Sequence, residues 1–192
     1  EMCIRDRIMA GRKGKAVEPI AFSGNCRFFS PQTMRRLDEI LTISLHNAIE
    51  HGIEPIQARK AAGKHERGLI SISSNYVGEQ VEVRISDDGQ GVDSASVAKI
   101  FELGFSTAGA VSDESGRGLG LNDVRQMMTE FGGSVSATSE RGHGFNMTLT
   151  FPQQTSRFMN RFTIFDMSSQ IILLLLNYND FLHRASLDFE VD

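Results

Sequence analysis

The sequence predicts an α/β (α+β) two-layer sandwich, in which helices cover one face of a mixed, mainly antiparallel sheet. Segments of alternating apolar and polar residues, typical of strands, are interspersed with segments whose apolar residues recur every three or four positions, typical of helices. Several expected strands follow one another across a short turn, which excludes a doubly wound parallel sheet because parallel neighbours need long crossovers. With 192 residues, 40% of them hydrophobic, the chain is long enough for one substantial core.

The regular pattern extends over residues 13–153, which we expect to form one domain. Residues 1–12 have no usable periodicity, and residues 154–192 lack the glycines and turn signals that punctuate the middle of the chain. We interpret both ends as tails that need not be native to the domain.

A strand and a long helix are expected first. The strand should cover Ala16–Phe22, and Ser30 followed by Pro31 supplies an N-cap and a first-turn proline for the helix, which should run to about His51. Gly52 should end it. Its apolar residues recur at three- and four-residue intervals and should share one face: Leu37, Ile40, Leu41, Leu45, Ala48 and Ile49.

The next elements are a short helix and a hairpin. The helix should cover Ile56–Ala62 and stop at Gly63. Residues 69–76 and 81–86 alternate in polarity on either side of a turn containing Gly78, so they should form two antiparallel strands.

The last third repeats the order of helix and hairpin. A short helix near 94–103 and a loop of low hydrophobicity over 106–116 precede an amphipathic helix that begins at Leu121 and is closed by two glycines, 132 and 133. Residues 134–138 and 145–151 should form the final hairpin.

Composition and charge exclude several classes of protein. The net charge of −4 and the pI near 5.8 provide no field that would gather nucleic acid or an anionic membrane, so any phosphate recognition must be local. Cys3 and Cys26 form no metal-binding pattern, and no apolar run approaches the roughly 20 residues that cross a bilayer. We therefore expect a cytoplasmic domain without a secretory signal.

Two segments provide polar side chains suited to a bound nucleotide. Asn47, on the long helix, can offer its amide oxygen to Mg²⁺ and its NH₂ group to phosphate, and Glu50 lies one turn further on the same face. Asp87 follows an expected strand directly, where its carboxylate can accept the exocyclic amino proton of adenine. Gly89 and Gly91 lack the Cβ that would keep the backbone away from a flat ring, although either could equally serve a turn.

Two further segments provide bare backbone. Gly116, Gly118 and Gly120 precede a helix and expose N–H groups to an anion, with help from the helix dipole and the guanidinium of Arg117. The spacing is that of neither a dinucleotide fingerprint nor a P-loop. Residues 142–144 form a glycine-containing turn, and Phe101 and Phe105 border the loop that could close over a ligand.

Taken in this order, the four segments resemble the ATP-binding domain of histidine kinases, within the superfamily shared with gyrase, the ninety-kilodalton heat-shock chaperone and MutL, whose fold is called the Bergerat fold. The chemotaxis kinase CheA is the most similar type. The corresponding motifs are the N box at 46–55, continued by Arg59 and Gly63-Lys64; the first glycine box at 87–91; the phenylalanine box at 101–107; the second glycine box at 115–120 with Val124-Arg125; and the third at 142–144.

The resemblance implies ATP bound with Mg²⁺ at Asn47, adenine recognised by Asp87, a lid over about 104–118, and transfer of the γ-phosphoryl group to a histidine. Glu50 and Arg117 are the expected catalytic residues. The expected nucleotide-binding residues are Asn47, His51, Asp87, Gly89, Gly91, Phe101, Phe105, Ser106, Thr107, Gly116, Arg117, Gly118, Leu119, Gly120, Gly142 and Gly144.

Three positions depart from the family pattern. Ile43 stands where the family has a His or Glu, one helical turn before Asn47, and an alkyl group cannot act as a base. Glu50 replaces an Asp, and Phe145 replaces a small hydroxyl residue. Two alternatives stay open: an ATP-binding regulatory module without catalysis, and a serine kinase of the anti-sigma-factor type. The CheA-like sequence after the N box counts against the second.

The phosphate acceptor is expected on another domain or protein. None of the five histidines, at 46, 51, 65, 143 and 183, lies in a segment resembling a dimerisation helix or a phosphotransfer domain. The resemblance implies that the partners are such a domain and a downstream response regulator within a two-component phosphorelay, and that the parent protein is a dimer. No nucleic acid and no membrane contact are expected of this domain.

Overall fold

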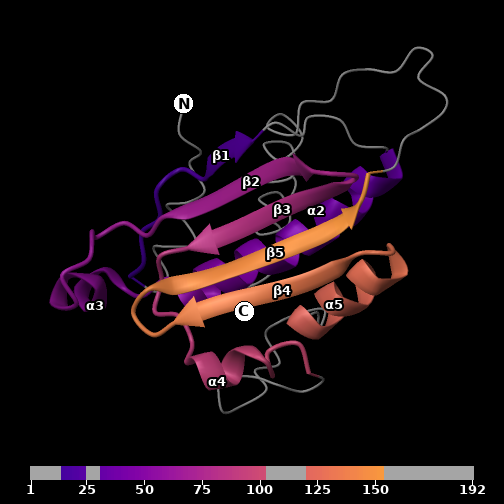
Figure 1. Cartoon of the computed structure of the whole chain (residues 1–192). Helices are drawn as coiled ribbons and strands as arrows, with labels where there is room; N and C mark the ends of the chain where they lie inside the picture. The colour runs from indigo at the N-terminus through magenta and orange to yellow at the C-terminus, as the bar shows by residue number, and fades with distance from the viewer. Residues whose placement is uncertain (1–13, 25–30, 103–119, 154–192) are drawn as a thin grey trace, which may run out of the picture. The chain divides into compact units, whose positions relative to one another are not determined.

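The computed structural model describes residues 14–24, 31–102 and 120–153 of the chain (Figure 1). The chain divides into two compact units, the first made of residues 1–26 and 43–153 and the second of residues 27–42 and 154–192. All the described strands belong to the first unit. Within the described part, no helix has the length and apolar character needed to cross a bilayer.

The first unit is built on a five-stranded sheet with the strand order β1-β2-β3-β5-β4 (Figure 1). β1 is parallel to β2, and the other neighbouring pairs are antiparallel, so the sheet is mixed and mainly antiparallel as predicted. The strands are β1 (Ala21–Gly24), β2 (Ile70–Val77), β3 (Gln80–Asp87), β4 (Ser134–Glu140) and β5 (Gly144–Pro152).

The two faces of this sheet differ sharply in polarity. Residues paired across neighbouring strands share a face, and Ile72, Ile85 and Met147 lie in one such row, all of them buried. The next row on the opposite face consists of Ser73, Arg84 and Thr148, none of which is buried. One face is therefore the core and the other is polar, which explains why the alternation in sequence is so regular.

Helices of the first unit lie on the apolar face. α5 (Leu121–Glu130) buries Val124 and Met128, and the ring of Phe131 just beyond it lies 5.3 Å from that of Phe151 on β5. The π-helix η1 (Ala48–Gly52) contacts β5, and α4 (Ser94–Val97) contacts β4. α3 (Ile56–Ala61) lies beyond the ends of the strands (Figure 1).

The second unit is described only over residues 31–42, the first part of α2 (Pro31–Asn47). Leu37, Ile40 and Leu41 are buried there, as the three- and four-residue spacing predicted. The expected N-cap, Ser30, lies outside the described residues.

The predicted elements are found, with three differences. The first strand begins at Ala21, and Val17 makes only an isolated bridge to Gly68, because Pro19 has no N–H to donate to a ladder. The long helix does not stay α-helical to His51 but ends in the π-helix η1. α4 stops at Val97, and three-residue turns continue the chain to Glu102.

Candidate functional site

The end of the long helix is shaped by η1. The N–H of Ile53 donates to the carbonyl of Ala48 at 2.7 Å, an i→i−5 bond that widens the last turn. Lys15 supports this turn from outside, because its Nζ donates to the carbonyls of Ile49 and Glu50 at 2.9 and 2.7 Å. Wide turns of this kind are frequent at functional sites because they displace the residues around them.

Asp87 is a buried carboxylate at the end of β3. Its Oδ1 accepts the N–H of Gly89 at 2.8 Å. Burial raises the pKa of Asp87 to about 6; the negative charge of Asp88 adds to the rise, while hydrogen bonds from the backbone N–H groups of Gly89 and Phe145 oppose it. A carboxylate held this way is a strong acceptor near neutral pH and has few protein donors of its own.

The turn after Asp87 is tied to η1 by Gln90. The backbone N–H of Gln90 donates to the carbonyl of Gly52 at 2.8 Å, and its side-chain Nε2 donates to the carbonyl of His51 at 2.7 Å. A Cβ on Gly52 would lie only 3.1 to 3.3 Å from the carboxylate atoms of Asp87. The end of the helix and the end of the strand thus meet at one place.

The turn over residues 142–144 joins the same cluster. The N–H of Gly142 donates to the carbonyl of Gln90 at 2.7 Å, and the Oγ of Ser139 bridges the N–H of Val92 and the carbonyl of Gly144 at 2.9 and 2.6 Å. Three of the four predicted segments therefore come together around Asp87.

The glycines of these turns are required by the protein's own backbone. A Cβ on Gly89 would lie 2.2 Å from the carbonyl oxygen of Gly52, one on Gly91 would lie 2.2 Å from that of Glu140, and one on Gly144 would meet that of Asp87. Two reasons were predicted for glycine at 89 and 91: the close approach of a flat ring, or a turn of the backbone. The structure gives a sufficient reason without a ligand, because backbone atoms already fill that space.

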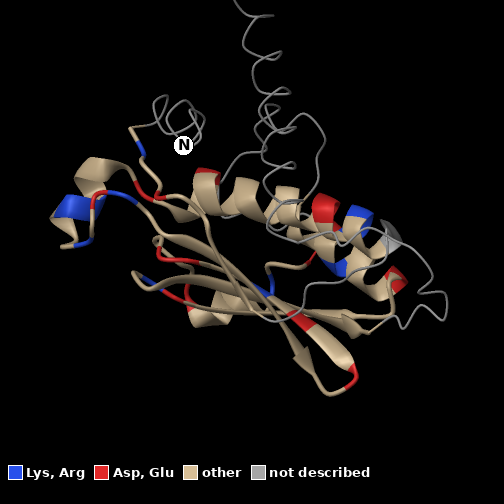
Figure 2. Cartoon of the chain, turned by 90° about the horizontal axis from the view of Figure 1, so that it is seen from above, with Lys and Arg blue, Asp and Glu red and all other residues tan. Residues whose placement is uncertain are grey.

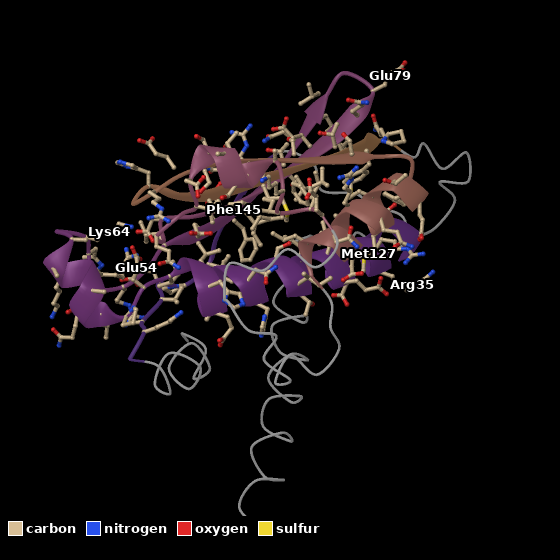
Figure 3. All side chains as sticks on the ribbon, turned by 90° about the horizontal axis from the view of Figure 1, so that it is seen from below. Arg35, Glu54, Lys64, Glu79, Met127 and Phe145 are labelled. Carbon is tan, nitrogen blue, oxygen red and sulfur yellow. The ribbon has the colours of Figure 1, made fainter. Side chains whose placement is uncertain are left out.

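A buried ion network that the motifs only partly indicated lies beside this cluster. Arg59 has no exposed surface, and its guanidinium contacts Glu54 at 2.9 Å and the carboxylate of Asp88 at 2.7 Å. The ammonium of Lys64 contacts Glu54 at 2.7 Å, and Figure 3 shows these two side chains together beside α3. Burial opposes ionisation of Glu54, but the hydrogen bond from Lys64 and the two nearby cations outweigh it and hold the pKa of Glu54 below its ordinary value.

At the start of α5, no atom of the described residues lies within 4 Å of the position that a Cβ on Gly120 would take. The N–H of Gly120 donates to the carboxylate of Asp123 at 2.6 Å, which is the half of a capping box that a glycine N-cap can make. One of the N–H groups predicted to face an anion is therefore satisfied within the helix itself.

Asn47 and Ile43 lie one helical turn apart, as predicted. Ile43 is buried, whereas Asn47 is half-buried and its side chain makes no hydrogen bond that caps η1. His51 is exposed and takes part through its carbonyl oxygen. Phe145 pairs with Asp87 across β3 and β5, so it lies next to that carboxylate on the apolar face.

One predicted residue lies away from this cluster, and others are not described. Phe101 is buried and lines a depression of about 410 Å³ with Glu102 and one side of α5; neither Asn47 nor Asp87 lines it. Several predicted residues lie outside the described part of the chain: Phe105, Ser106, Thr107, Gly116, Arg117, Gly118 and Leu119.

Sequence reasoning missed Gln90 and Asp88 and did not foresee the burial of Arg59. The only sequence signal for Arg59 and Lys64 was their place after the N box. Nothing in the pattern indicated that they contact a turn more than 20 residues away.

The chain also resembles known proteins in sequence. Residues 32–155 match the family described as "Histidine kinase-, DNA gyrase B-, and HSP90-like ATPase". The chemotaxis protein CheA of Klebsiella aerogenes is 32% identical over 167 residues, which are 76% of this chain and 26% of that protein. The gliding motility regulatory protein of Myxococcus xanthus is 33% identical over 133 residues, 57% of this chain and 17% of that protein. The chain spans about a quarter of the length of the first of these curated relatives.

Solved structures share the fold. The catalytic domain of histidine kinase ThkA superposes with a TM-score of 0.53 over 75% of this chain and 82% of that chain, at 21% identity. Full-length ShkA in complex with AMPPNP superposes with a TM-score of 0.54 over 75% of this chain and 27% of that chain, at 26% identity. The mixed sheet with helices on one face is therefore an arrangement found in histidine kinase structures.

Proposed function

This chain belongs to the histidine kinase-, DNA gyrase B- and HSP90-like ATPase family, and on that premise we propose that it is the ATP-binding catalytic module of a CheA-like sensor histidine kinase. The module occupies residues 13–153. It transfers the γ-phosphoryl group of ATP to a histidine on a phosphotransfer or dimerisation domain, from which a response regulator is phosphorylated. It acts in the cytoplasm, within a dimeric parent protein.

The observation that carries this proposal is the meeting of η1, the turn after Asp87 and the turn at 142–144. Gln90 binds two successive carbonyls of η1 through its backbone and its side chain, and its own carbonyl accepts the N–H of Gly142. Segments separated by as many as 90 residues of sequence are thus fixed around one buried carboxylate. Such a construction supports a binding site, because a fold does not need a desolvated acid for its stability.

Asp87 is the residue we assign to adenine. Its carboxylate accepts a proton of the exocyclic amino group, and its pKa of about 6 keeps it mainly ionised at neutral pH. Phe145, its cross-strand neighbour, supplies an aromatic surface for the base. A base with a carbonyl group at the same position would present an acceptor to an acceptor, which favours adenine over hypoxanthine or guanine.

Asn47 and the start of α5 are assigned to the phosphates. The amide oxygen of Asn47 fits Mg²⁺, which takes few protein ligands and keeps several waters, and the absence of a capping bond to η1 is consistent with this role. Bound Mg²⁺ neutralises charge on the phosphates. The backbone N–H groups of residues 116–119 and the guanidinium of Arg117 hold the phosphate oxygens, since the N–H of Gly120 already donates to Asp123.

Transfer to histidine depends mostly on positioning and charge neutralisation, so the missing base at Ile43 need not abolish it. Glu50 lies one turn beyond Asn47, where its carboxylate would hold a water of the Mg²⁺ shell. Two measurements test the assignment: calorimetry of the full chain with MgATP, and transfer of labelled phosphate to a supplied phosphotransfer domain. Binding and transfer support the proposal. Binding without transfer points to the regulatory alternative, and absence of binding overturns both.

Replacing Ile43 by His is expected to raise the rate of transfer by about 10²- to 10⁴-fold, because a base one helical turn from Asn47 could accept the proton of the acceptor imidazole. The affinity for MgATP should change little. Single-turnover transfer measures the rate, and Ile43→Leu is the matched control for loss of the isoleucine. A variant with His at 43 that transfers no faster than Ile43→Leu would contradict the role assigned to this position.

A further inference from the structure

The peptide that joins Asp88 to Gly89 is held at both ends by hydrogen bonds. On its carbonyl side, the oxygen of Asp88 accepts from the Nζ of Lys64 at 2.9 Å and from Nη1 of Arg59 at 3.3 Å. On its amide side, the N–H of Gly89 donates to Oδ1 of Asp87 at 2.8 Å. A single peptide unit therefore connects two cations to the carboxylate assigned to adenine.

The two cations have little freedom. Arg59 is fully buried, its Nε donates to the carbonyl of His65 at 2.7 Å, and its Nη2 contacts the carboxylate of Asp88. Lys64 is 17% exposed and also donates to the carbonyl of Gly89 at 2.7 Å. Glu54 accepts from both cations. Figure 2 shows basic segments at α3 beside acidic ones.

This cluster does not act through a net charge. Two cations face two carboxylates, Glu54 and Asp88, so their combined field falls off over a short distance. The effect of the two cations on Asp87 must pass through the 88–89 peptide. A cation at the carbonyl oxygen polarises this peptide unit and strengthens the hydrogen bond that its N–H donates. A purely structural role would be served as well by apolar side chains, since buried ion pairs rarely add stability.

We propose that Lys64 and Arg59 are positioning residues for nucleobase recognition: by fixing the 88–89 peptide, they aim the Gly89 N–H at Asp87 and so set the orientation in which that carboxylate meets the adenine amino group. The inference rests on the function proposed above. Loss of either cation should therefore weaken the discrimination of adenine at position 6 of the base. Contacts to sugar and phosphate should be unaffected.

The test compares ATP with purine riboside triphosphate, which differs only by the missing exocyclic amino group. In the wild-type chain, the ratio of the two dissociation constants should be about 10- to 100-fold in favour of ATP, the range expected for a hydrogen bond to a charged group. In Lys64→Met the ratio should fall at least about threefold. The dissociation constant of purine riboside triphosphate itself should not change.

Lys60→Met is the matched control, because the side chain of Lys60 is 56% exposed on α3 and its ammonium contacts the exposed carboxylate of Glu66 at 2.8 Å. It should keep the wild-type ratio. Lys64→Arg should retain most of the discrimination because it keeps a cation at the carbonyl. The amide proton shift of Gly89 gives a second readout, which should move upfield in Lys64→Met and not in Lys60→Met.

Lys64→Gln provides a second variant should Lys64→Met fail to fold, and an intermediate ratio is expected from its neutral donor. An unchanged ratio in Lys64→Met and Lys64→Gln, or an equal loss of affinity for both nucleotides in them, overturns the positioning role. A wild-type chain that binds neither nucleotide overturns the proposed function itself, and one that binds both equally overturns the assignment of Asp87.

Discussion

Gly89 and Gly144, beside Asp87, differ from Gly78 and Gly120, which lie at an outer hairpin turn and at the start of α5. A Cβ on either of the first two would meet a backbone carbonyl oxygen, at 2.2 Å from Gly89 and closer still from Gly144. A Cβ on either of the other two would lie within 4 Å of no atom of the described residues. Glycine is therefore required by contact with the backbone beside Asp87, whereas the described residues impose no such requirement at Gly78 or Gly120.

The largest effect is expected at Gly144. An alanine there would force its methyl into the carbonyl of Asp87 and would also hold φ at +87°, so the free energy of unfolding should fall by more than about 3 kcal/mol. Gly78→Ala is the matched control, because the φ of Gly78 is also positive but an added Cβ would contact nothing there. It should cost only about 1 kcal/mol of unfolding free energy. Urea unfolding measures both, and equal losses would refute the contact explanation.

A second pair removes the influence of φ, since neither Gly89 nor Gly120 lies in the left-handed region. Gly89→Ala should cost about 2 to 3 kcal/mol of unfolding free energy because the backbone of Gly52 must shift. Gly120→Ala should cost less than about 1 kcal/mol, because its methyl group would meet no atom of the described residues. Its affinity for MgATP should nevertheless fall if phosphate lies there; a stable Gly120→Ala chain with unchanged affinity would remove this residue from the phosphate site.

Asp87→Asn should change stability and binding in opposite directions. The pKa of Asp87 is raised to about 6 when folded, so its contribution to stability is complete below pH 3.8 and is lost as the pH rises through 6. The asparagine variant should therefore be more stable than wild type by about 1 to 3 kcal/mol at pH 7.5, with the difference vanishing near pH 4.

The same substitution should weaken MgATP binding at least about tenfold, because an amide accepts the amino proton less strongly than a carboxylate. Wild-type affinity should likewise decline as the pH falls below 6. Thermal unfolding across this pH range, paired with calorimetry, measures both effects. If the Asp87→Asn variant is less stable than wild type at pH 7.5, interactions of the ionised carboxylate outweigh the cost of burying it, and the prediction is wrong.

The fold could be predicted because each element carries its own periodic signal. The alternation in β2 and β3 and the three- and four-residue spacing in α5 are local, and the expected boundaries agree with the structure to within a few residues. The π-helix η1 was not predicted, since its sequence continues the helical pattern and the extra residue in the turn is set by the contact of Gly52 with Gln90.

The site could be predicted only in part. Asn47 and Asp87 could be predicted from their side-chain chemistry and from the order of the motifs. The hydrogen bond from the side chain of Gln90 to His51 joins residues 39 positions apart, so no local sequence pattern indicates it. Arg59 would ordinarily be expected at the surface, and its complete burial follows from Glu54 and Asp88 lying on either side of it. Contacts between distant segments are what sequence periodicity does not encode.

The central claim is that one ligand contacts the helix end, the strand end and the start of α5 together. Titration of the ¹⁵N-labelled full chain with MgATP, followed by amide shifts, tests it most directly. The account predicts saturable shifts at Asn47, Gly89 and Gly120 with one common dissociation constant, and none at the distant turn containing Gly78. Shifts confined to one of these segments, or separate constants for them, would contradict it.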